Sequence, residues 1–231
     1  MSKRPGEKRP REKGPREKGK DPAIPLLRVR GLSRRFGEHE VVKDLDLDVM
    51  AGTAVALIGP NGSGKSTVLR CITGTDKPSE GTVHLDGRKL DERDPRIRSA
   101  LAVVMDDIDF FPDLSVVEHL DLFAHAHGVA DADDLVDEVL HDVGLMEQSG
   151  QLPGTLSTGQ RTRLALASAF VRPRRLLVLD EPEQRLDKQG LGWLAERLNA
   201  DKADGLGILM ASHDQGLIEA VADRTVELGN A

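Results

Sequence analysis

The sequence predicts an α/β fold: a mainly parallel sheet covered by helices on both faces, with an antiparallel β flank and a small helical subdomain. Short apolar runs alternate with segments of helical spacing along most of the 231 residues, an alternation typical of parallel sheets with helical crossovers. A glycine-rich segment directly follows one apolar run, and acidic or histidine residues follow two others. Because the carboxyl ends of parallel strands meet at one edge of a sheet, we expect these side chains to share a ligand site.

The elements of the first half predict the flank and the first central strand. Residues 26–31 and 45–49 alternate between apolar and polar side chains, as half-buried strands do. Residues 53–58 are continuously apolar and predict a buried strand, after which a helix covers residues 68–72. Two further strands are expected at 82–85 and 101–105.

The second half continues the alternation. Residues 157–171 predict a helix, because Leu164, Leu166, Ala167 and Phe170 are spaced to face a core. Buried strands are expected at 176–179 and 206–211, and helices at 190–198 and 216–222.

The composition indicates a globular protein of a reducing compartment. Hydrophobic residues make up 39% of the chain and charged residues 31%, and no apolar run approaches the roughly 20 residues that cross a bilayer. The N-terminus is charged from Lys3 onward and lacks the apolar core of a secretory signal. One cysteine, Cys71, excludes an internal disulfide framework, and its place in a helix favours a small buried residue over a reactive thiol. We therefore expect a cytoplasmic protein.

Residues 1–23 are expected to form a disordered basic tail. The first 21 residues hold nine Lys or Arg against four Asp or Glu, and Pro-Arg-Glu-Lys-Gly occurs twice in tandem, at 10–14 and 15–19. Between Lys3 and Pro22 the segment has no apolar residue to bury. Such a tail suits either contact with lipid headgroups or nucleic acid, or a solubilising extension without a fixed partner.

A strongly acidic stretch lies in the middle of the chain. No Lys or Arg occurs between Arg98 and Arg161, while thirteen Asp or Glu do. Residues 115–127 and 132–143 have helical spacing, so this stretch predicts a helical insert with one apolar face. Its acidic exterior is either simply solvated or a docking surface for a basic partner or for the chain's own tail. Four histidines of this stretch are expected to cover its surface rather than bind metal: His119, His125, His127 and His141.

The glycine-rich segment has the composition of a phosphate-binding loop. Its three glycines allow tight turns in which successive N–H groups converge on phosphate oxygens, and the helix that follows adds the favourable end of its dipole. Lys65 supplies a charge for the β- and γ-phosphates, and the Ser66 hydroxyl is suited to Mg²⁺. A flexible surface loop would not explain lysine and hydroxyl residues at these positions. The segment comprises Gly59, Pro60, Asn61, Gly62, Ser63, Gly64, Lys65, Ser66 and Thr67.

A second functional signal is the apolar strand that ends in Asp180 and Glu181. Adjacent buried carboxylates repel each other, which is costly unless a cation lies between them. Asp180 can hold the Mg²⁺ shell while Glu181 accepts a proton from an attacking water. Together with Lys65 and Ser66, this pair predicts hydrolysis of a nucleoside triphosphate.

The turn at residues 156–160 predicts a second anion site. Ser157, Gly159 and Gln160 open a helix, so backbone N–H groups and the Ser157 hydroxyl are available to a γ-phosphate. The same residues in isolation would be an ordinary helix cap. One chain does not need two such sites for one triphosphate, so the pattern indicates two facing subunits, each completing the other.

With these motifs in this order, the chain resembles the ATP-binding cassette (ABC) ATPase family. Residues 59–67 are similar to its Walker A motif, and residues 176–181 to its Walker B motif. Residues 156–160 are similar to the Leu-Ser-Gly-Gly-Gln signature, with Thr158 in place of the first glycine. The resemblance implies a P-loop NTPase core over residues 24–231 that includes a helical subdomain at about 107–172.

The resemblance also assigns roles to single residues. Asp187 matches the D-loop and His213 the switch histidine that holds the γ-phosphate, although a strand-end histidine is otherwise a core residue. Phe36 falls where the family stacks an aromatic ring on adenine, although an aromatic residue is otherwise more often part of a core. ATP and Mg²⁺ are the implied ligands, with Lys65, Glu181 and His213 as the catalytic residues.

Two positions depart from the family pattern. Asp106 stands where relatives have a glutamine that reaches Mg²⁺. Compared with glutamine, an aspartate side chain is charged, is one methylene shorter and has no N–H to donate. We expect Asp106 still to reach the metal. Residues 183–185, Glu-Gln-Arg, replace the small residues that usually precede Leu-Asp. Communication between two nucleotide sites through this loop is therefore in question.

The function that the resemblance implies is that of an energy-coupling subunit of a transporter. The chain would dimerise, as a homodimer or heterodimer of cassettes, and dock near residues 106–114 on separate integral membrane subunits at the inner face of the membrane. No specific nucleic-acid partner is expected. Alternatives are a soluble ABC-type ATPase, and a nucleotide-sensing regulatory module, which Asp106 favours and Glu181 and His213 oppose.

Overall fold

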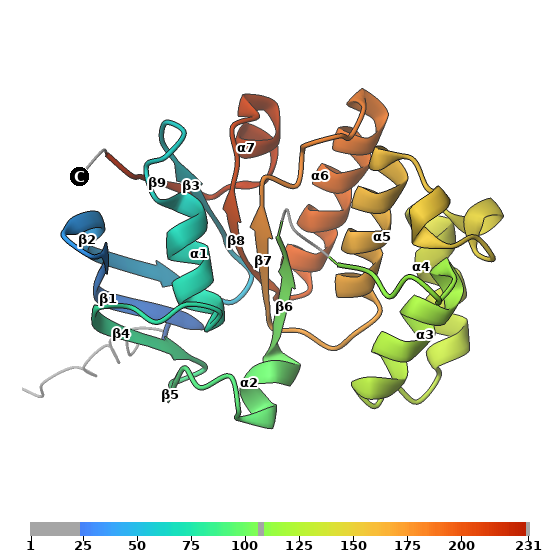
Figure 1. Cartoon of the computed structure of the whole chain (residues 1–231), viewed down its shortest axis with the longest axis horizontal. Helices are drawn as coiled ribbons and strands as arrows, with labels where there is room; N and C mark the ends of the chain where they lie inside the picture. Colours follow the sequence, from blue (N-terminus) through green and yellow to red (C-terminus); the bar gives the residue numbers. More distant parts are fainter. Residues whose placement is uncertain (1–23, 106–108, 230–231) are drawn as a thin grey trace, which may run out of the picture.

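The computed structural model describes residues 24–105 and 109–229, which form two sheets surrounded by helices (Figure 1). A five-stranded sheet has the order β6-β7-β8-β3-β9, and a four-stranded sheet the order β2-β1-β4-β5. All pairs in the first sheet are parallel, and all pairs in the second are antiparallel. The parallel strands are β3 (Ala54–Ile58), β6 (Leu101–Val104), β7 (Leu176–Asp180), β8 (Gly207–Ala211) and β9 (Arg224–Glu227); the antiparallel strands are β1 (Leu27–Phe36), β2 (His39–Val49), β4 (Glu80–Leu85) and β5 (Arg88–Lys89).

Both faces of the parallel sheet are buried. Along β7, Leu177 and Leu179 belong to one apolar cluster and Leu176 and Val178 to the other, because successive side chains of a strand point to opposite faces. One cluster includes residues of α5 (Thr158–Phe170), α6 (Lys188–Ala203) and α7 (Gln215–Val221). The other includes residues of α1 (Lys65–Thr73), of α2 (Pro95–Ala100) and of the antiparallel sheet. The predicted α/β class with an antiparallel flank is confirmed.

Some elements differ from expectation. Strands β1 and β2 are longer than predicted, since they pair with register shifts that carry the ladder to Phe36 and His39. Strands β5 and β9 and helix α2 were not expected at all. Helix α2 begins with Pro95 after the N-cap Asp94, whose side chain accepts from the Arg96 N–H, an arrangement favoured at helix starts.

The acidic stretch folds into two helices, α3 (Val116–Ala126) and α4 (Ala132–Asp142). Their apolar faces pack into the same cluster as α5, through residues such as Leu120 and Val139. The opposite face of α4 exposes carboxylates at positions 133, 134, 137 and 138. The prediction of an amphipathic acidic insert is therefore confirmed.

His119 contradicts the expectation that the histidines of this stretch cover its surface. It is only 1% exposed, because it lies on the apolar face of α3 beside Leu120. Its Nε2 accepts from the Phe111 N–H at 2.8 Å, and its Nδ1 lies 3.0 Å from the Ser115 carbonyl oxygen. The described residues contain no group of three or more potential ligands that could hold a metal ion. His119 fixes the chain before α3 and does so as a packed core histidine.

A polar network joins α4 to α6. Trp193 Nε1 donates to Asp142 Oδ1 at 2.9 Å, and Arg197 Nη1 donates to Asp142 Oδ2 at 2.6 Å. Arg197 also bonds Asp201 at 3.1 Å and stacks over the Phe170 ring, with its guanidinium carbon 4.9 Å from the ring centre. The network connects the acidic helices to α6, which packs against the parallel sheet.

Three other expectations concern single segments. Cys71 is fully buried, which raises the pKa of its thiol to about 11, so the expectation of a buried, unreactive cysteine is confirmed. Among the described helices, none combines the length and apolar character needed to cross a membrane. The predicted tail at 1–23 and Asp106 lie outside the described residues and stay predictions.

Candidate functional site

The glycine-rich loop follows β3 and has a backbone that only glycines adopt without strain. Gly59, Gly62 and Gly64 have φ values of 146°, 80° and 92°, in the region that side chains disfavour. A Cβ at Gly59 would overlap the Leu228 carbonyl oxygen and lie 2.8 Å from Ser63 Oγ. A side chain at Gly59 is therefore excluded by crowding against Leu228, whereas at Gly62, which has open space around it, the positive φ alone disfavours one.

Helix α1 begins inside this loop and leaves its first N–H groups free of side-chain caps. Its N-cap is Gly64, which has no side chain to accept a hydrogen bond. Lys65 is 5% exposed, and its Nζ donates to the carbonyl oxygens of Gly59 at 3.0 Å and Pro60 at 3.1 Å. Uncapped N–H groups and a buried ammonium together favour an anion.

A cavity of about 270 Å³ lies over the loop. It is lined by Val41, Asn61, Gly62, Gly64, Lys65, Ser66, Thr67 and Glu181. The phosphate loop thus forms most of the wall, and the Glu181 carboxylate, directly after β7, faces it.

The carboxyl ends of two neighbouring strands bring the other predicted residues together. Asp180 is the last residue of β7 and is 7% exposed, and Glu181 follows it with a φ of 48°. Strand β8 pairs with β7 and leads through Ser212 to His213. His213 Nε2 lies 3.1 Å from Glu181 Oε1. The predicted base and the predicted switch histidine therefore contact each other directly.

The residues present fit a magnesium ion. Mg²⁺ prefers oxygen ligands and is bound in nucleotide sites by one or two protein groups together with the phosphates. The Ser66 hydroxyl at the start of α1 and the Asp180 carboxylate are such groups, and Ser66 lines the cavity over the loop. A site of this kind does not require a larger cluster of ligands.

The second predicted anion site lies at the N-terminus of α5, where the side chains of the turn cap the helix. Ser157 Oγ accepts from the Gln160 N–H at 3.3 Å, and Gln160 Oε1 accepts from the Ser157 N–H at 2.8 Å, which forms a capping box. Ser157 and Thr158 are exposed. A Cβ on Gly159 would lie 2.9 Å from the Arg185 carbonyl oxygen, so this turn packs against the loop after β7.

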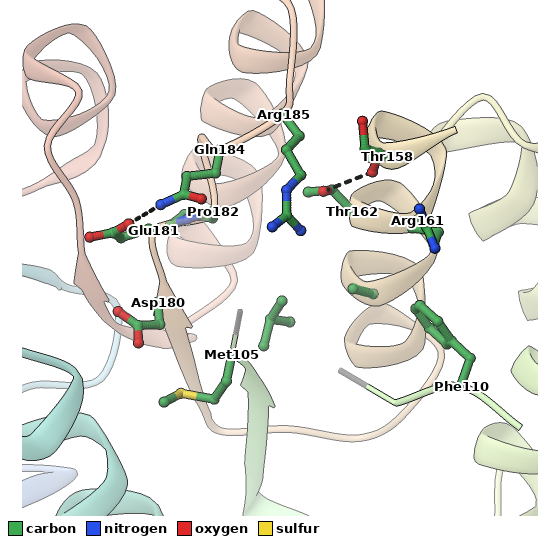
Figure 2. Close-up of a pocket in the computed structure, with 12 residues that line it drawn as sticks. Met105, Phe110, Thr158, Arg161, Thr162, Asp180, Glu181, Pro182, Gln184 and Arg185 are labelled. Carbon is green, nitrogen blue, oxygen red and sulfur yellow. Dashed lines mark hydrogen bonds between the residues drawn. The ribbon is translucent and has the colours of Figure 1, made fainter. Parts of the chain in front are cut away.

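A second cavity, of about 330 Å³, separates this end of α5 from the end of β7 (Figure 2). Thr158, Arg161 and Thr162 line one side, and Asp180 and Glu181 line the other. Glu181 lines both cavities, but no residue of 157–160 lines the cavity over the phosphate loop. The two predicted anion sites of one chain therefore open into different spaces.

Two further predicted residues lie at the edges of the site. Phe36, at the end of β1, is 51% exposed, and the guanidinium carbon of Arg34 lies 4.3 Å from the centre of its ring. One face of the ring is thus covered by a cation. Asp187 is the N-cap of α6, and its Oδ1 accepts from the Gly190 N–H at 2.7 Å. The same Oδ1 lies 3.8 Å from Arg163 Nη2, so Asp187 also contacts α5.

Sequence reasoning did not assign a role to Glu183 and Gln184, which both contact the site. Gln184 Nε2 donates to Glu181 Oε2, and Glu183 Oε1 accepts from the His213 N–H at 2.7 Å. The available signal was the presence of long polar side chains where the family pattern has small ones.

The fold and the site define a nucleotide-binding ATPase cassette. Residues 42–184 match the family described as ABC transporter. The chain is 37% identical over 203 residues to the spermidine/putrescine import ATP-binding protein PotA of Pseudomonas aeruginosa; the match covers 87% of this chain and 56% of that protein. The chain belongs to the ABC transporter family, and it spans about half the length of this relative.

Solved structures agree with this assignment. The structure of an ATP binding subunit of an ABC transporter superposes with a TM-score of 0.83 at 31% identity, covering 89% of this chain and 86% of that one. The ATP-binding cassette MJ0796, solved as a dimer in a post-hydrolysis state with ADP and Pi, superposes with a TM-score of 0.77 at 25% identity, covering 88% and 94%. These likenesses confirm the expected fold.

Proposed function

We propose that this protein hydrolyses ATP and supplies the energy for transport across a membrane through separate membrane-spanning partners. The observation that carries the proposal is the convergence of the phosphate loop, Asp180, Glu181 and His213 at one edge of the parallel sheet. Phosphoryl transfer needs little covalent chemistry from the protein, so positioned charges and one base are sufficient.

Each residue has a distinct task in the proposed reaction. Lys65 and the N–H groups of the phosphate loop neutralise the charge that develops on the phosphates. Ser66 and Asp180, with Asp106 as a further candidate, would hold Mg²⁺, which supplies additional charge neutralisation. Glu181 accepts the proton of the attacking water. His213 turns from Glu181 to hold the γ-phosphate. Phe36 offers the exposed part of its ring to adenine.

A dimer of cassettes completes the site. In the turn of Ser157, Gly159 and Gln160, the serine is exposed and the other two are half-buried, and the turn does not line the cavity over its own phosphate loop. It is available instead to the nucleotide of a second cassette, with Asp187 near the contact. The dimeric state of the MJ0796 cassette supports this arrangement.

The membrane partners are proposed to be separate integral subunits, which would hold this chain at the cytoplasmic face. Their cytoplasmic loops are expected to be rich in Lys and Arg, and the exposed face of α4 offers carboxylates to such loops. Copurification of the chain with an integral membrane protein is the expected result. Full ATPase activity in vivo without any membrane partner would favour a soluble ABC-type ATPase instead.

The Glu181→Gln variant tests the catalytic assignment. Removal of a general base costs on the order of 10² to 10⁴ in rate, so kcat should fall by that factor while ATP binding persists and a nucleotide-bound dimer accumulates. Steady-state ATPase assays, equilibrium ATP binding and size-exclusion chromatography measure the three effects.

The matched control is Glu196→Gln, the same chemical change on the exposed surface of α6, which should leave all three unchanged. Turnover of Glu181→Gln at the wild-type rate would refute the assignment.

A further inference from the structure

The turn after β7 directs two long side chains at the catalytic residues. It runs from Glu181 to Gln184, whose backbone N–H donates to the Glu181 carbonyl oxygen at 3.1 Å. Glu181 takes the left-handed backbone conformation, which costs free energy in a residue other than glycine. This turn places the side chain of Gln184 on the same side as that of Glu181, as the close-up shows (Figure 2).

Gln184 and His213 hold the two oxygens of the Glu181 carboxylate. Gln184 Nε2 donates to Oε2, and His213 Nε2 lies 3.1 Å from Oε1. An ionised carboxylate only accepts hydrogen bonds, so the amide turns its NH₂ group toward it. The two donors come from different loops, one after β7 and one after β8, and together they fix the orientation of the carboxylate.

Glu183 fixes the second of these loops. Its Oε1 accepts from the backbone N–H of His213 at 2.7 Å and of Asp214 at 3.3 Å. Within the part of the chain that the structure describes, its Oε2 is buried without a hydrogen-bond partner, and a buried charged oxygen is costly when it is unmatched. A side chain that costs stability but fixes a catalytic loop is typical of functional sites, where locally unfavourable residues are retained for function.

We propose that Gln184 is a positioning residue for ATP hydrolysis: it keeps the Glu181 carboxylate directed at the attacking water, while Glu183 fixes the loop that carries His213. The inference rests on the proposed function, because it assumes that Glu181 is the base. It goes further in assigning a task to the two residues that replace small side chains in this chain.

The need for Gln184 follows from the second task of His213. When His213 turns to the γ-phosphate, Oε1 of Glu181 loses its donor and the carboxylate can rotate. Among the described residues, Gln184 is then the side chain that still holds the carboxylate, through Oε2. Because small displacements of a catalytic group reduce the rate strongly, loss of this contact affects kcat and leaves ATP binding unchanged.

Gln184→Met is the decisive variant, because methionine has nearly the length of glutamine and lacks the donor. We expect kcat to fall about tenfold, the effect of one lost hydrogen bond to a charged group, with KM within about twofold of the wild type. Gln184→Ala should match it, and Gln184→Glu should lose more, because two carboxylates then repel. If Gln184 acted by packing alone, Gln184→Met would keep the wild-type kcat and Gln184→Ala would not.

Glu183 is tested by a conservative pair. Glu183→Gln keeps an acceptor oxygen for the His213 N–H and should stay within about threefold of the wild-type kcat, whereas Glu183→Ala should lose about tenfold. Gln189→Met is the matched control for Gln184, since Gln189 is exposed on α6, and it should have wild-type kinetics.

A spectroscopic readout is independent of turnover. In the nucleotide-free protein, the side-chain amide resonance of Gln184, identified by its loss in Gln184→Met, should shift in Glu181→Ala and stay in place in Glu196→Ala. An amide resonance that is unaffected by Glu181→Ala would overturn the proposal.

The kinetic outcomes separate this inference from the proposed function. If Glu181→Gln keeps wild-type turnover, the proposed mechanism fails. If Glu181→Gln loses turnover while Gln184→Met has wild-type or higher kcat, the positioning role of Gln184 alone fails; a higher kcat would mean that Gln184 restrains the base instead of directing it.

Discussion

The N-termini of α1 and α5 are both predicted anion sites, and they differ in how their backbone N–H groups are used. At α1 the N-cap is a glycine, no side chain caps the helix, and a buried lysine lies beside the free N–H groups. At α5 the N-cap is Ser157, and a reciprocal capping box with Gln160 occupies the turn. The first site is ready for a phosphate in one chain alone. The second is capped without a ligand, which agrees with the proposal that it binds the nucleotide of another cassette.

The two sites also differ in what they cost or contribute to the stability of the fold. The phosphate loop keeps three glycines in left-handed conformations, each of which loses more chain entropy on folding than another residue would. The turn at α5 follows ordinary helix-capping chemistry and gains stability from it, about 1 kcal/mol for a serine cap. Binding of a nucleotide therefore has to offset the entropy cost of the phosphate loop, whereas the turn at α5 has no such cost to offset.

The largest expected effect comes from Lys65→Met, which removes the feature that only the first site has. ATP affinity should fall about 100-fold, because a charge-assisted contact to phosphate is lost. The fold should persist, since methionine replaces a buried ammonium whose hydrogen bonds among the described residues are to carbonyl oxygens.

Equilibrium ATP binding and urea unfolding measure these two quantities. Unchanged affinity in Lys65→Met would mean that the first site is not the primary phosphate site.

Ser157→Ala should have an intermediate effect, and its effect on catalysis should be confined to the dimer. Loss of the cap lowers the free energy of unfolding by about 1 kcal/mol, and loss of the hydroxyl from the second site lowers kcat about tenfold. ATP affinity of the single chain should not change, because the turn does not line the cavity over the phosphate loop.

Ser115→Ala is a matched control, because Ser115 forms the same capping box with Glu118 at the start of α3. It should show the same loss of stability in thermal unfolding and a wild-type kcat. Equal kcat in the two variants would show that Ser157 acts only as a helix cap.

The smallest effect is expected from Thr158→Gly, which restores the glycine usual in the signature. The Thr158 side chain is exposed, and its carbonyl oxygen, which accepts from Thr162 Oγ1 at 3.2 Å, is kept in the variant. Stability should fall by about 0.5 kcal/mol from the lower helix propensity of glycine, and kcat should change less than about threefold.

Thermal unfolding and steady-state kinetics would measure both effects. A gain in kcat beyond threefold would show instead that the threonine hinders closure onto the second nucleotide.

Much of the fold could be predicted because the central strands are unmistakable in the sequence. The run before Gly59 and the run before Asp180 are apolar at every position, as doubly covered strands must be. Strand β9 offers no such signal: three of its four residues are exposed, and its pairing with β3 is made by the backbone. Helix α2 does carry a sequence signal, an aspartate N-cap followed by Pro95.

The candidate site divides in the same way. The strand-end positions of Asp180 and His213 follow from the parallel sheet, and the burial of His119 follows from its place three residues after Val116 on the apolar face of α3. The contacts of Glu183 and Gln184 depend on a left-handed residue at Glu181 and on the four-residue turn from Glu181 to Gln184. Neither has a sequence signature, since a glutamate in that conformation is set by the surrounding structure.

The contact between Trp193 and Asp142 gives this protein a built-in optical probe. The chain has one tryptophan and no tyrosine, so nearly all of its intrinsic fluorescence comes from the junction between the acidic helices and the core. The indole N–H is bonded to a carboxylate of α4 and the ring lies against Phe170. Emission from this single fluorophore therefore reports, without any label, on movement of the acidic helices relative to the sheet.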